Sequence, residues 1–285
     1  MNNIKKQRVI DAVFSKIGLV ATILGLVILA FFLTDIFKTG FTRIDWDFIT
    51  SYPSRHAARS GILPSWVGTL WILCLTVLVS IPIGIGAGIY FEEYSPKNRF
   101  TYILEINIAN LAGVPSIIYG LLGLELFVRY LGLGGSLLTG AFTLSLLILP
   151  IIIVSTRESL KAVPESIRLA SFGLGATKWQ TIWLNVLPAS RGGIVTGTIL
   201  ALSRAVGETA PLIVIGALAY VPFVPSTPMD QFTVLPMQIF NWTSRPQYDF
   251  LVNAAAAIII LLSITFAMNG IAIYLRNRWQ KKIQW

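Results

Sequence analysis

Hydrophobic runs divide the chain into stretches long enough to cross a membrane. Six runs are dominated by apolar side chains, at about 17–33, 66–91, 106–128, 136–155, 194–221 and 251–275. A helix needs roughly 20 apolar residues to cross a hydrocarbon core of about 30 Å. The pattern therefore predicts an all-α, polytopic membrane protein with six transmembrane helices.

The composition supports this class. The 285 residues are 55% hydrophobic and only 12% charged, whereas a soluble domain is roughly 25% charged. A soluble fold of this composition would expose too much apolar surface to water. No small-residue cleavage site follows the first run, so we interpret it as a span rather than a signal peptide. With one cysteine (Cys74) and one histidine (His56), we expect neither a disulfide nor a metal site.

Basic residues predict the orientation. Of the 22 Lys and Arg, fifteen lie in the N-terminal segment, the second and fourth loops and the C-terminal tail, six lie in the alternate loops, and Arg204 lies inside a span. Basic residues collect in cytoplasmic loops. We therefore expect a cytoplasmic segment 1–16, a membrane domain 17–275 and a cytoplasmic tail 276–285. The net charge of +9 comes without the interleaved aromatics of a nucleic-acid surface, so no nucleic-acid partner is expected.

Two loops on the opposite side are long. Residues 34–65 and 222–250 are rich in proline, tryptophan, tyrosine and aspartate. This content favours ordered caps over the membrane, and plain connecting loops are the alternative.

The fifth run carries ionisable residues. Arg204 and Glu208 are four residues apart, so in a helix they share one face, and Thr209 follows them. Such side chains cost roughly 2.5–3.5 kcal/mol or more at the bilayer centre and are functional candidates. A guanidinium matches the geometry of an oxyanion. The pair is therefore interpreted either as part of an anion pathway or as a structural ion pair.

The third run is also polar for a lipid-facing helix. Asn107, Asn110, Ser116 and Tyr119 punctuate it, and a Gly-x-Pro sequence at 113–115 interrupts it. Freed backbone groups are tolerated only inside protein or against a wet cavity. The polar side chains either line a pathway or join helices by hydrogen bonds.

The second run ends with two distinct features. Gly84, Gly86 and Gly88 would allow another helix to approach closely, and Glu92 and Glu93 follow them. We interpret the two glutamates as a solvated helix end on the cytoplasmic side.

The fourth loop, about 156–191, is too long for a bare connector. Pro164 and Glu165 predict a helix start, the glycines at 173 and 175 a break, and Thr177 a second short helix that Leu187 and Pro188 close. A helix–turn–helix of this kind would dock a soluble partner. The sequence has no phosphate-binding loop G-x-x-x-x-G-K-[ST], no G-x-S-x-G and no H-E-x-x-H, so we expect no enzymatic activity from this chain.

This loop resembles the EAA loop of ABC-importer permeases, E-A-A-x3-G-x9-I-x-L-P. Ala170, Gly175, Leu187 and Pro188 fall on the pattern, whereas Leu169, Ser171 and Asn185 depart from it. The resemblance implies that the loop couples the permease to an ATPase. Seven residues are expected to carry that coupling: Glu165, Ala170, Ser171, Gly175, Ala176, Leu187 and Pro188.

Residues 110–120 and 204–212 resemble the phosphate-specific ABC permeases, and the Ala-Pro-Leu ending of the second stretch and the 90–94 stretch resemble the PstA-type subunit. The resemblance implies a type I ABC-importer permease fold with cytoplasmic coupling helices in a bacterial inner membrane. It also implies a heterodimer with a PstC-like permease, two PstB-like ATPase subunits that hold ATP and Mg, and a periplasmic phosphate-binding protein. No cofactor is expected on this chain.

The predicted function is import of inorganic phosphate by alternating access, driven by ATP hydrolysed on another chain. The expected substrate pathway comprises Arg204, Glu208, Thr209, Asn107, Asn110, Ser116 and Tyr119. A permease for sulfate or molybdate is the nearest alternative. A secondary transporter or channel is a further one, but it needs no docking loop, and a membrane-embedded enzyme lacks its nucleophile or metal cluster.

Overall fold

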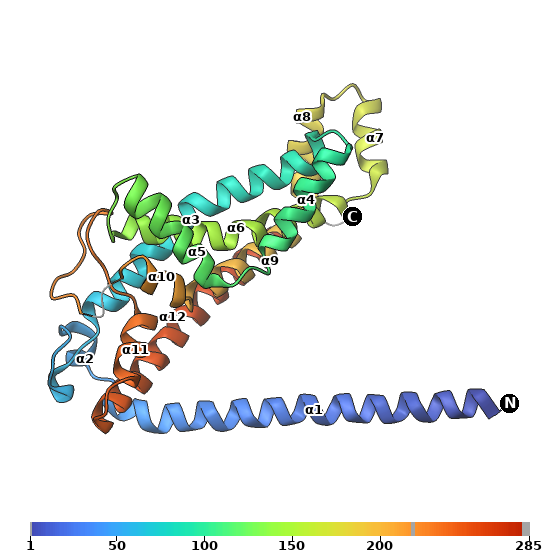
Figure 1. Cartoon of the computed structure of the whole chain (residues 1–285). Helices are drawn as coiled ribbons and strands as arrows, with labels where there is room; N and C mark the ends of the chain where they lie inside the picture. The colour runs from blue at the N-terminus through green and yellow to red at the C-terminus, as the bar shows by residue number, and fades with distance from the viewer. Residues whose placement is uncertain (1, 218–219, 281–285) are drawn as a thin grey trace.

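The computed structural model describes residues 2–217 and 220–280, and its regular structure is helical. Figure 1 shows the α-helices, which are α1 (Asn2–Gly40), α2 (Trp46–Thr50), α3 (Leu63–Ile89), α4 (Arg99–Leu111), α5 (Ser116–Gly123), α6 (Leu137–Lys161), α7 (Glu165–Gly173), α8 (Lys178–Thr181), α9 (Leu187–Val206), α10 (Ala210–Val214), α11 (Leu235–Thr243) and α12 (Tyr248–Gln280). Shorter 3-10 segments are η1 (Phe41–Arg43) and η2 (Ala57–Arg59), and π-helical segments are η3 (Tyr90–Tyr94), η4 (Leu124–Tyr130) and η5 (Ile182–Val186).

The six-span prediction is confirmed by length and composition. Within the part of the chain that the structure describes, five continuous helical stretches are long and apolar enough to cross a bilayer, and a bent pair makes the sixth. The bent pair joins Arg99–Leu111 to Ser116–Tyr130 at 104°. Its break lies at the predicted Gly-x-Pro sequence, because proline disfavours helical backbone in the residue before it. Pro115 itself precedes the first residue of α5 in an extended conformation.

The predicted limits of the fifth span, 194–221, are wrong. The continuous stretch runs from Lys178 to Val206, and α10 follows as a separate short helix. Gly207 ends α9, and Pro211 lies in the first turn of α10, where its missing N–H costs no hydrogen bond.

The prediction that Leu187 and Pro188 close the docking unit is also wrong. The helix passes through them, because Pro188 lies in the first turn of α9, directly after the π-helical η5. The helical hydrogen-bond ladder is already irregular at a π turn. The backbone N–H that Pro188 lacks is therefore tolerated at this position.

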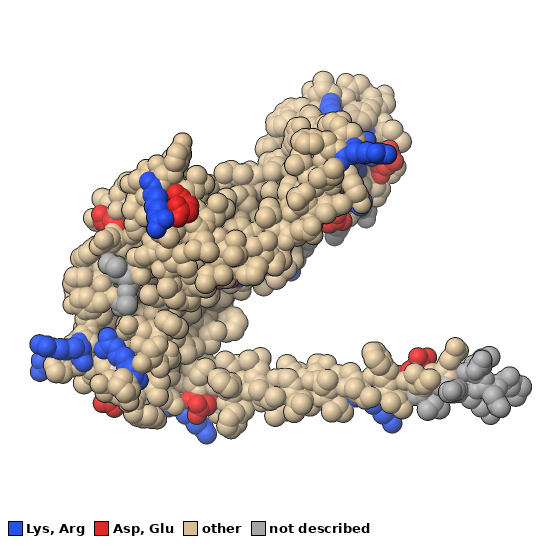
Figure 2. Space-filling model, viewed as in Figure 1, with Lys and Arg blue, Asp and Glu red and all other residues tan. Residues whose placement is uncertain are grey.

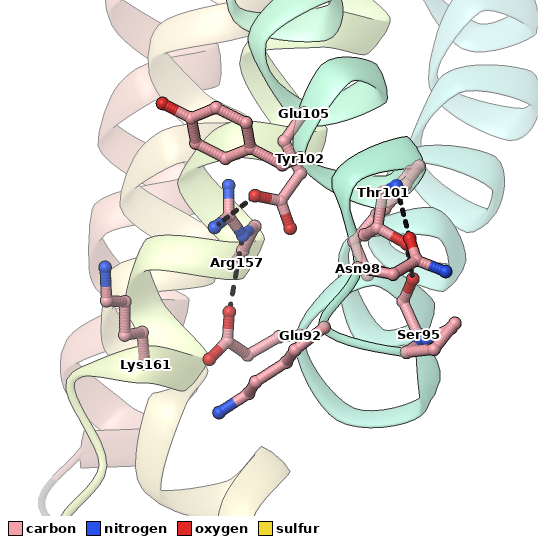
Figure 3. A pocket seen from close by; sticks show the side chains of 11 residues that line it. Glu92, Ser95, Asn98, Thr101, Tyr102, Glu105, Arg157 and Lys161 are labelled. Carbon is pink, nitrogen blue, oxygen red and sulfur yellow. Dashed lines mark hydrogen bonds and ion pairs between the residues drawn. The ribbon is translucent and has the colours of Figure 1, made fainter.

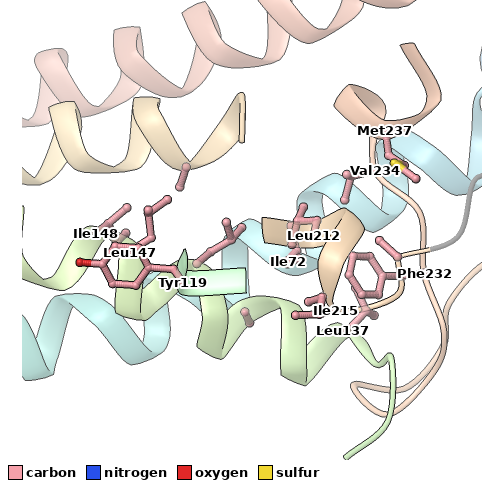
Figure 4. Packing of buried hydrophobic residues seen from close by; sticks show 14 of the residues in the cluster. Ile72, Tyr119, Leu137, Leu147, Ile148, Leu212, Ile215, Phe232, Val234 and Met237 are labelled. Atoms are coloured by element: carbon pink, nitrogen blue, oxygen red, sulfur yellow. The ribbon is translucent and has the colours of Figure 1, made fainter. Parts of the chain in front are cut away.

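The main core lies between α3, α5, α6, α9 and α10. Ile72, Leu144 and Ile148 are almost completely buried in it, together with Leu212. Figure 4 shows how the segment around Phe232 closes one end of this cluster. Helices far apart in sequence are therefore held by one apolar centre.

Glycines bring α3 against α6. A Cβ on Gly84 would lie 2.6 Å from Ile152, and one on Gly88 would lie 2.6 Å from Thr156, whereas Gly86 faces open space. The predicted close approach is thus confirmed for two of the three glycines, whose four-residue spacing places them on one face.

The two long loops form an ordered cap, as predicted. Phe48 of α2 and Trp242 of α11 are fully buried, with ring centroids 6.0 Å apart, and Phe250 packs against Trp242. Aromatic and aliphatic side chains thus build a second, smaller core at this end of the molecule.

The molecule is elongated, with the cap at one end and α7 and α8 at the other (Figure 1). Helix α1 departs from the bundle at the cap, and the ends of α1 and α12 point toward the α7 side. Figure 2 shows charged atoms gathered at the two ends of this face and an almost uncharged middle. That distribution suits a protein whose middle lies in lipid.

Candidate translocation and docking sites

Arg204 and Glu208 meet where α9 ends. The Arg204 Nε lies 3.7 Å from the Glu208 carboxylate, and their side chains are 36% and 17% exposed. Glu208 lies just beyond the last helical residue, so the pair spans the break rather than one helical face. The guanidinium is thus neutralised only loosely and stays accessible.

The break in the fifth span faces the break in the third. An Arg204 Nη1 donates to the carbonyl of Ala112 at 3.5 Å, and the Tyr119 hydroxyl donates to the neighbouring carbonyl of Leu111 at 2.7 Å. The last carbonyls of a helix have no partner within the helix. Arg204 and Tyr119, both predicted pathway residues, therefore donate hydrogen bonds to the free backbone carbonyls at the end of α4.

The remaining pathway residues are only partly brought together. Ser116 and Thr209 are half-buried beside the two breaks. Asn107 and Asn110 lie on exposed positions of α4, and Asn107 donates to the carbonyl of Ile103 in its own helix. Among the described residues neither asparagine hydrogen-bonds to Arg204 or Glu208.

A cationic fork beside two helix breaks can attract an anion. The charge is partly offset by Glu208, so binding would be weak enough for release. The alternative, a structural pair, uses the same contacts. Whether these residues line the pathway stays a prediction.

The docking loop has the predicted helix–turn–helix. Glu165 begins α7, and the helix ends in a turn in which Gly175 donates to Phe172 and Ala176 donates to Ser171. This is the Schellman pattern, which needs a left-handed residue, and Gly175 has φ +83°. Thr177 then caps α8 reciprocally with Gln180.

Two departures from the EAA pattern contact each other. The Asn185 amide donates to the Ser171 hydroxyl at 3.2 Å, and that hydroxyl lies 2.9 Å from the hydroxyl of Thr181. Ser171 is buried, so these hydrogen bonds lie inside the loop. The sequence signal for this contact was that Ser171 and Asn185, two of the positions that depart from the EAA pattern, are both polar.

The outer surface of the loop carries exposed apolar side chains. Leu174 is 90% exposed, and Trp179 and Trp183 stack 5.4 Å apart while remaining exposed. Glu165 and Ala170 are exposed on α7, and Leu187 and Pro188 are half-buried behind it. An exposed apolar patch of this kind marks a protein contact.

Sequence reasoning missed the role of Glu92 and Glu93. They are not a solvated helix end, since Glu93 lies 2.7 Å from Arg168 of α7 and Glu92 lies 3.3 Å from Arg157 of α6. The Glu93 side chain is only 9% exposed. Two acids in a basic loop region were the available signal, but their partners lie 65 to 75 residues away.

The family whose members are described as binding-protein-dependent transport system inner membrane components matches residues 80–281. The chain belongs to this family. It is therefore a multi-pass inner-membrane permease of an ABC importer, which works with an ATPase and a substrate-binding protein and is not itself catalytic.

Curated relatives of the permease cover most of its length. The probable ABC transporter permease protein YqgI of Bacillus subtilis is 30% identical over 263 residues, which are 87% of this chain and 89% of the relative. The phosphate transport system permease protein PstA of Haemophilus influenzae is 33% identical over 244 residues, 85% of this chain and 86% of the relative. The predicted resemblance to PstA-type permeases is thus confirmed.

Solved structures share the fold of the permease at low identity. A bacterial ABC transporter that imports alginate has a TM-score of 0.65 at 15% identity, over 91% of this chain and 93% of that one. The MetNI methionine transporter in an inward-facing conformation has a TM-score of 0.57 at 16% identity, over 74% and 93%. The type I ABC-importer fold is therefore confirmed.

Proposed function

We propose that this permease subunit imports inorganic phosphate. The carrying observation is Arg204, placed between two broken spans and loosely paired with Glu208. PstA proteins that are 28–33% identical over most of the chain support phosphate as the anion. The proposed partners are a PstC-like permease, two PstB-like ATPase subunits and a periplasmic phosphate-binding protein.

The proposed mechanism is alternating access. ATP binding closes the ATPase dimer, which moves the docking loop and opens the cavity toward the binding protein. Arg204 then compensates the charge of the released anion, assisted by hydroxyl groups such as Thr209 and Ser116. Because Glu208 competes for the guanidinium, the anion is held weakly and leaves on the cytoplasmic side.

The test is uptake by the reconstituted complex. Proteoliposomes containing this chain with its partners should accumulate labelled phosphate with ATP, and excess unlabelled phosphate should abolish the signal. Excess sulfate or molybdate should leave it unchanged. A complex with a hydrolysis-deficient ATPase is the control. Uptake of labelled sulfate or molybdate in place of phosphate would contradict the proposal and favour the other-oxyanion permease.

A further inference from the structure

The π turn η3 at the end of α3 collects contacts from three other helices. Glu92 pairs with Arg157 of α6, Glu93 pairs with Arg168 of α7, and the ring of Tyr94 lies 4.9 Å from the Lys178 ammonium of α8. Two of these helices, α7 and α8, form the docking loop. The turn is therefore a point at which the loop contacts the membrane bundle.

Arg168 connects α7 both to η3 and to the end of α6. Its guanidinium donates to Glu93, to the carbonyl of Leu160 at 2.9 Å and to the carbonyl of Val163 at 2.7 Å. Those carbonyls lie at or just beyond the end of α6, where backbone acceptors need outside donors. With side chains 17% and 9% exposed, the Arg168–Glu93 pair is shielded from the salt screening that weakens surface pairs.

Arg157 continues the contacts to the bent third span. Figure 3 shows its two ion pairs, 2.9 Å to Glu105 of α4 and 3.3 Å to Glu92. All three side chains are mostly buried. A cavity of about 360 Å³ lies beside them and is lined by residues of η3, α4, α6 and the segment 95–98. Thr101 is the only buried residue of α4, so the ion pair is a principal attachment of this helix to the described chain.

The far end of α4 reaches the candidate pathway. Seven residues after Glu105, the carbonyl of Ala112 accepts from Arg204. The contacts thus run without a gap from α7 through Glu93 and Glu92 to Arg157, then through Glu105 and α4 to Arg204.

We infer that the network of Glu92, Glu93, Glu105, Arg157 and Arg168 transmits movement of the docking loop to the bent third span during transport. Arg168 and Glu93 act as positioning residues, because they hold α7 against η3 and the end of α6. The inference rests on the proposed role of the α7–α8 loop as the ATPase dock. It adds the connection from that dock to the pathway.

The experiment compares transport per ATP in reconstituted complexes. Glu93→Gln and Arg168→Gln should each assemble with the ATPase and keep at least half of its basal hydrolysis. Labelled phosphate imported per ATP should fall at least tenfold. The double variant should fall no further than Glu93→Gln alone, because both substitutions remove one connection.

Glu158→Gln is the matched control. Glu158 lies next to Arg157 on α6, is exposed, and forms no ion pair among the described residues, so its variant should keep the wild-type ratio. A Glu93→Gln complex with an unchanged ratio would overturn the inference. Transport and hydrolysis that fall together would overturn it as well, since that result indicates a role only in assembly.

A variant of the α7–α8 loop tests separately whether this loop docks the ATPase. Leu174→Glu places a charge on the 90% exposed tip of the loop and should abolish co-purification of the ATPase. If Leu174→Glu retains the ATPase and wild-type uptake, the dock proposal fails. If it loses the ATPase while Glu93→Gln couples normally, only the transmission network fails.

Discussion

At the scale of single residues, Arg204 decides between an anion pathway and a structural pair. Arg204→Gln removes the charge and keeps a polar side chain, so phosphate uptake by assembled complex should fall at least tenfold. In the swap Arg204→Glu with Glu208→Arg, the attraction persists while the cation moves from the last turn of α9 to the break that follows it. Uptake should therefore stay low in the swap as well.

The comparison requires equal amounts of assembled complex in each membrane. Arg129→Gln serves as the control, because Arg129 pairs with Glu125 in an exposed position on η4. Near-normal uptake by the swapped protein would leave the Arg204–Glu208 pair as scaffold only.

The hydrogen bond between Ser171 and Asn185 allows a test by restoring the family pattern. Ser171→Ala leaves the half-buried Asn185 amide without its partner, which should cost about 1–3 kcal/mol and lower the thermal midpoint of the complex. Ser171→Ala with Asn185→Ile removes both of these polar groups but leaves the buried Thr181 hydroxyl without Ser171, so it should recover part of the loss. A double variant less stable than the single one would contradict this account.

At the scale of elements, the turn after α7 depends on Gly175. A Cβ there has open space, so steric crowding is not the cost of a side chain at this position. The positive φ is the cost, and Gly175→Ala should destabilise the turn by about 1–2 kcal/mol. Hydrogen exchange in α7 should accelerate. Gly173→Ala, in the last helical position with equal space, should slow or preserve that exchange.

Asp230 holds the cap segment beside the start of α6. Its carboxylate accepts from the hydroxyls and backbone amides of Ser226 and Thr227, and these bonds, led by the Thr227 hydroxyl, place the pKa of Asp230 well below 3.8. The ionised form is the stabilising one. The turn should therefore be unchanged from pH 7 to about 4 and loosen as the pH falls further.

Proteolysis of segment 222–234 measures this effect. Asp230→Asn should increase cleavage at pH 7, because it removes the charge that strengthens the four bonds. Cleavage of Asp230→Asn should stay high at every pH, because the variant has no carboxylate to titrate. Equal cleavage of Asp230→Asn and wild type at pH 7 would show that the carboxylate does not hold the turn.

At the scale of the whole molecule, the arrangement of the ends predicts topology. The ends of α1 and α12 point toward the docking side, away from the cap (Figure 1). Reporter fusions at Gly132 and Ser226 should therefore read outside. A fusion at Trp285, which lies outside the described residues, should read inside. A C-terminal reporter found outside would contradict both the charge pattern and the six-span topology.

Local pattern in the sequence determined the spans, the break at 113–115, the ordered caps and the two short docking helices. Each depends on neighbouring residues: apolar runs of sufficient length, a proline that restricts the residue before it, and caps at Thr177 and Gly175. The family resemblance was likewise readable, because it lies in contiguous motifs.

Only the tertiary structure decided which polar side chains meet. The breaks of the third and fifth spans come together at Ala112 and Arg204, 92 residues apart, and Glu93 finds Arg168 at a separation of 75 residues. Sequence spacing specifies faces of one helix, whereas contacts between helices follow from how their apolar faces pack together.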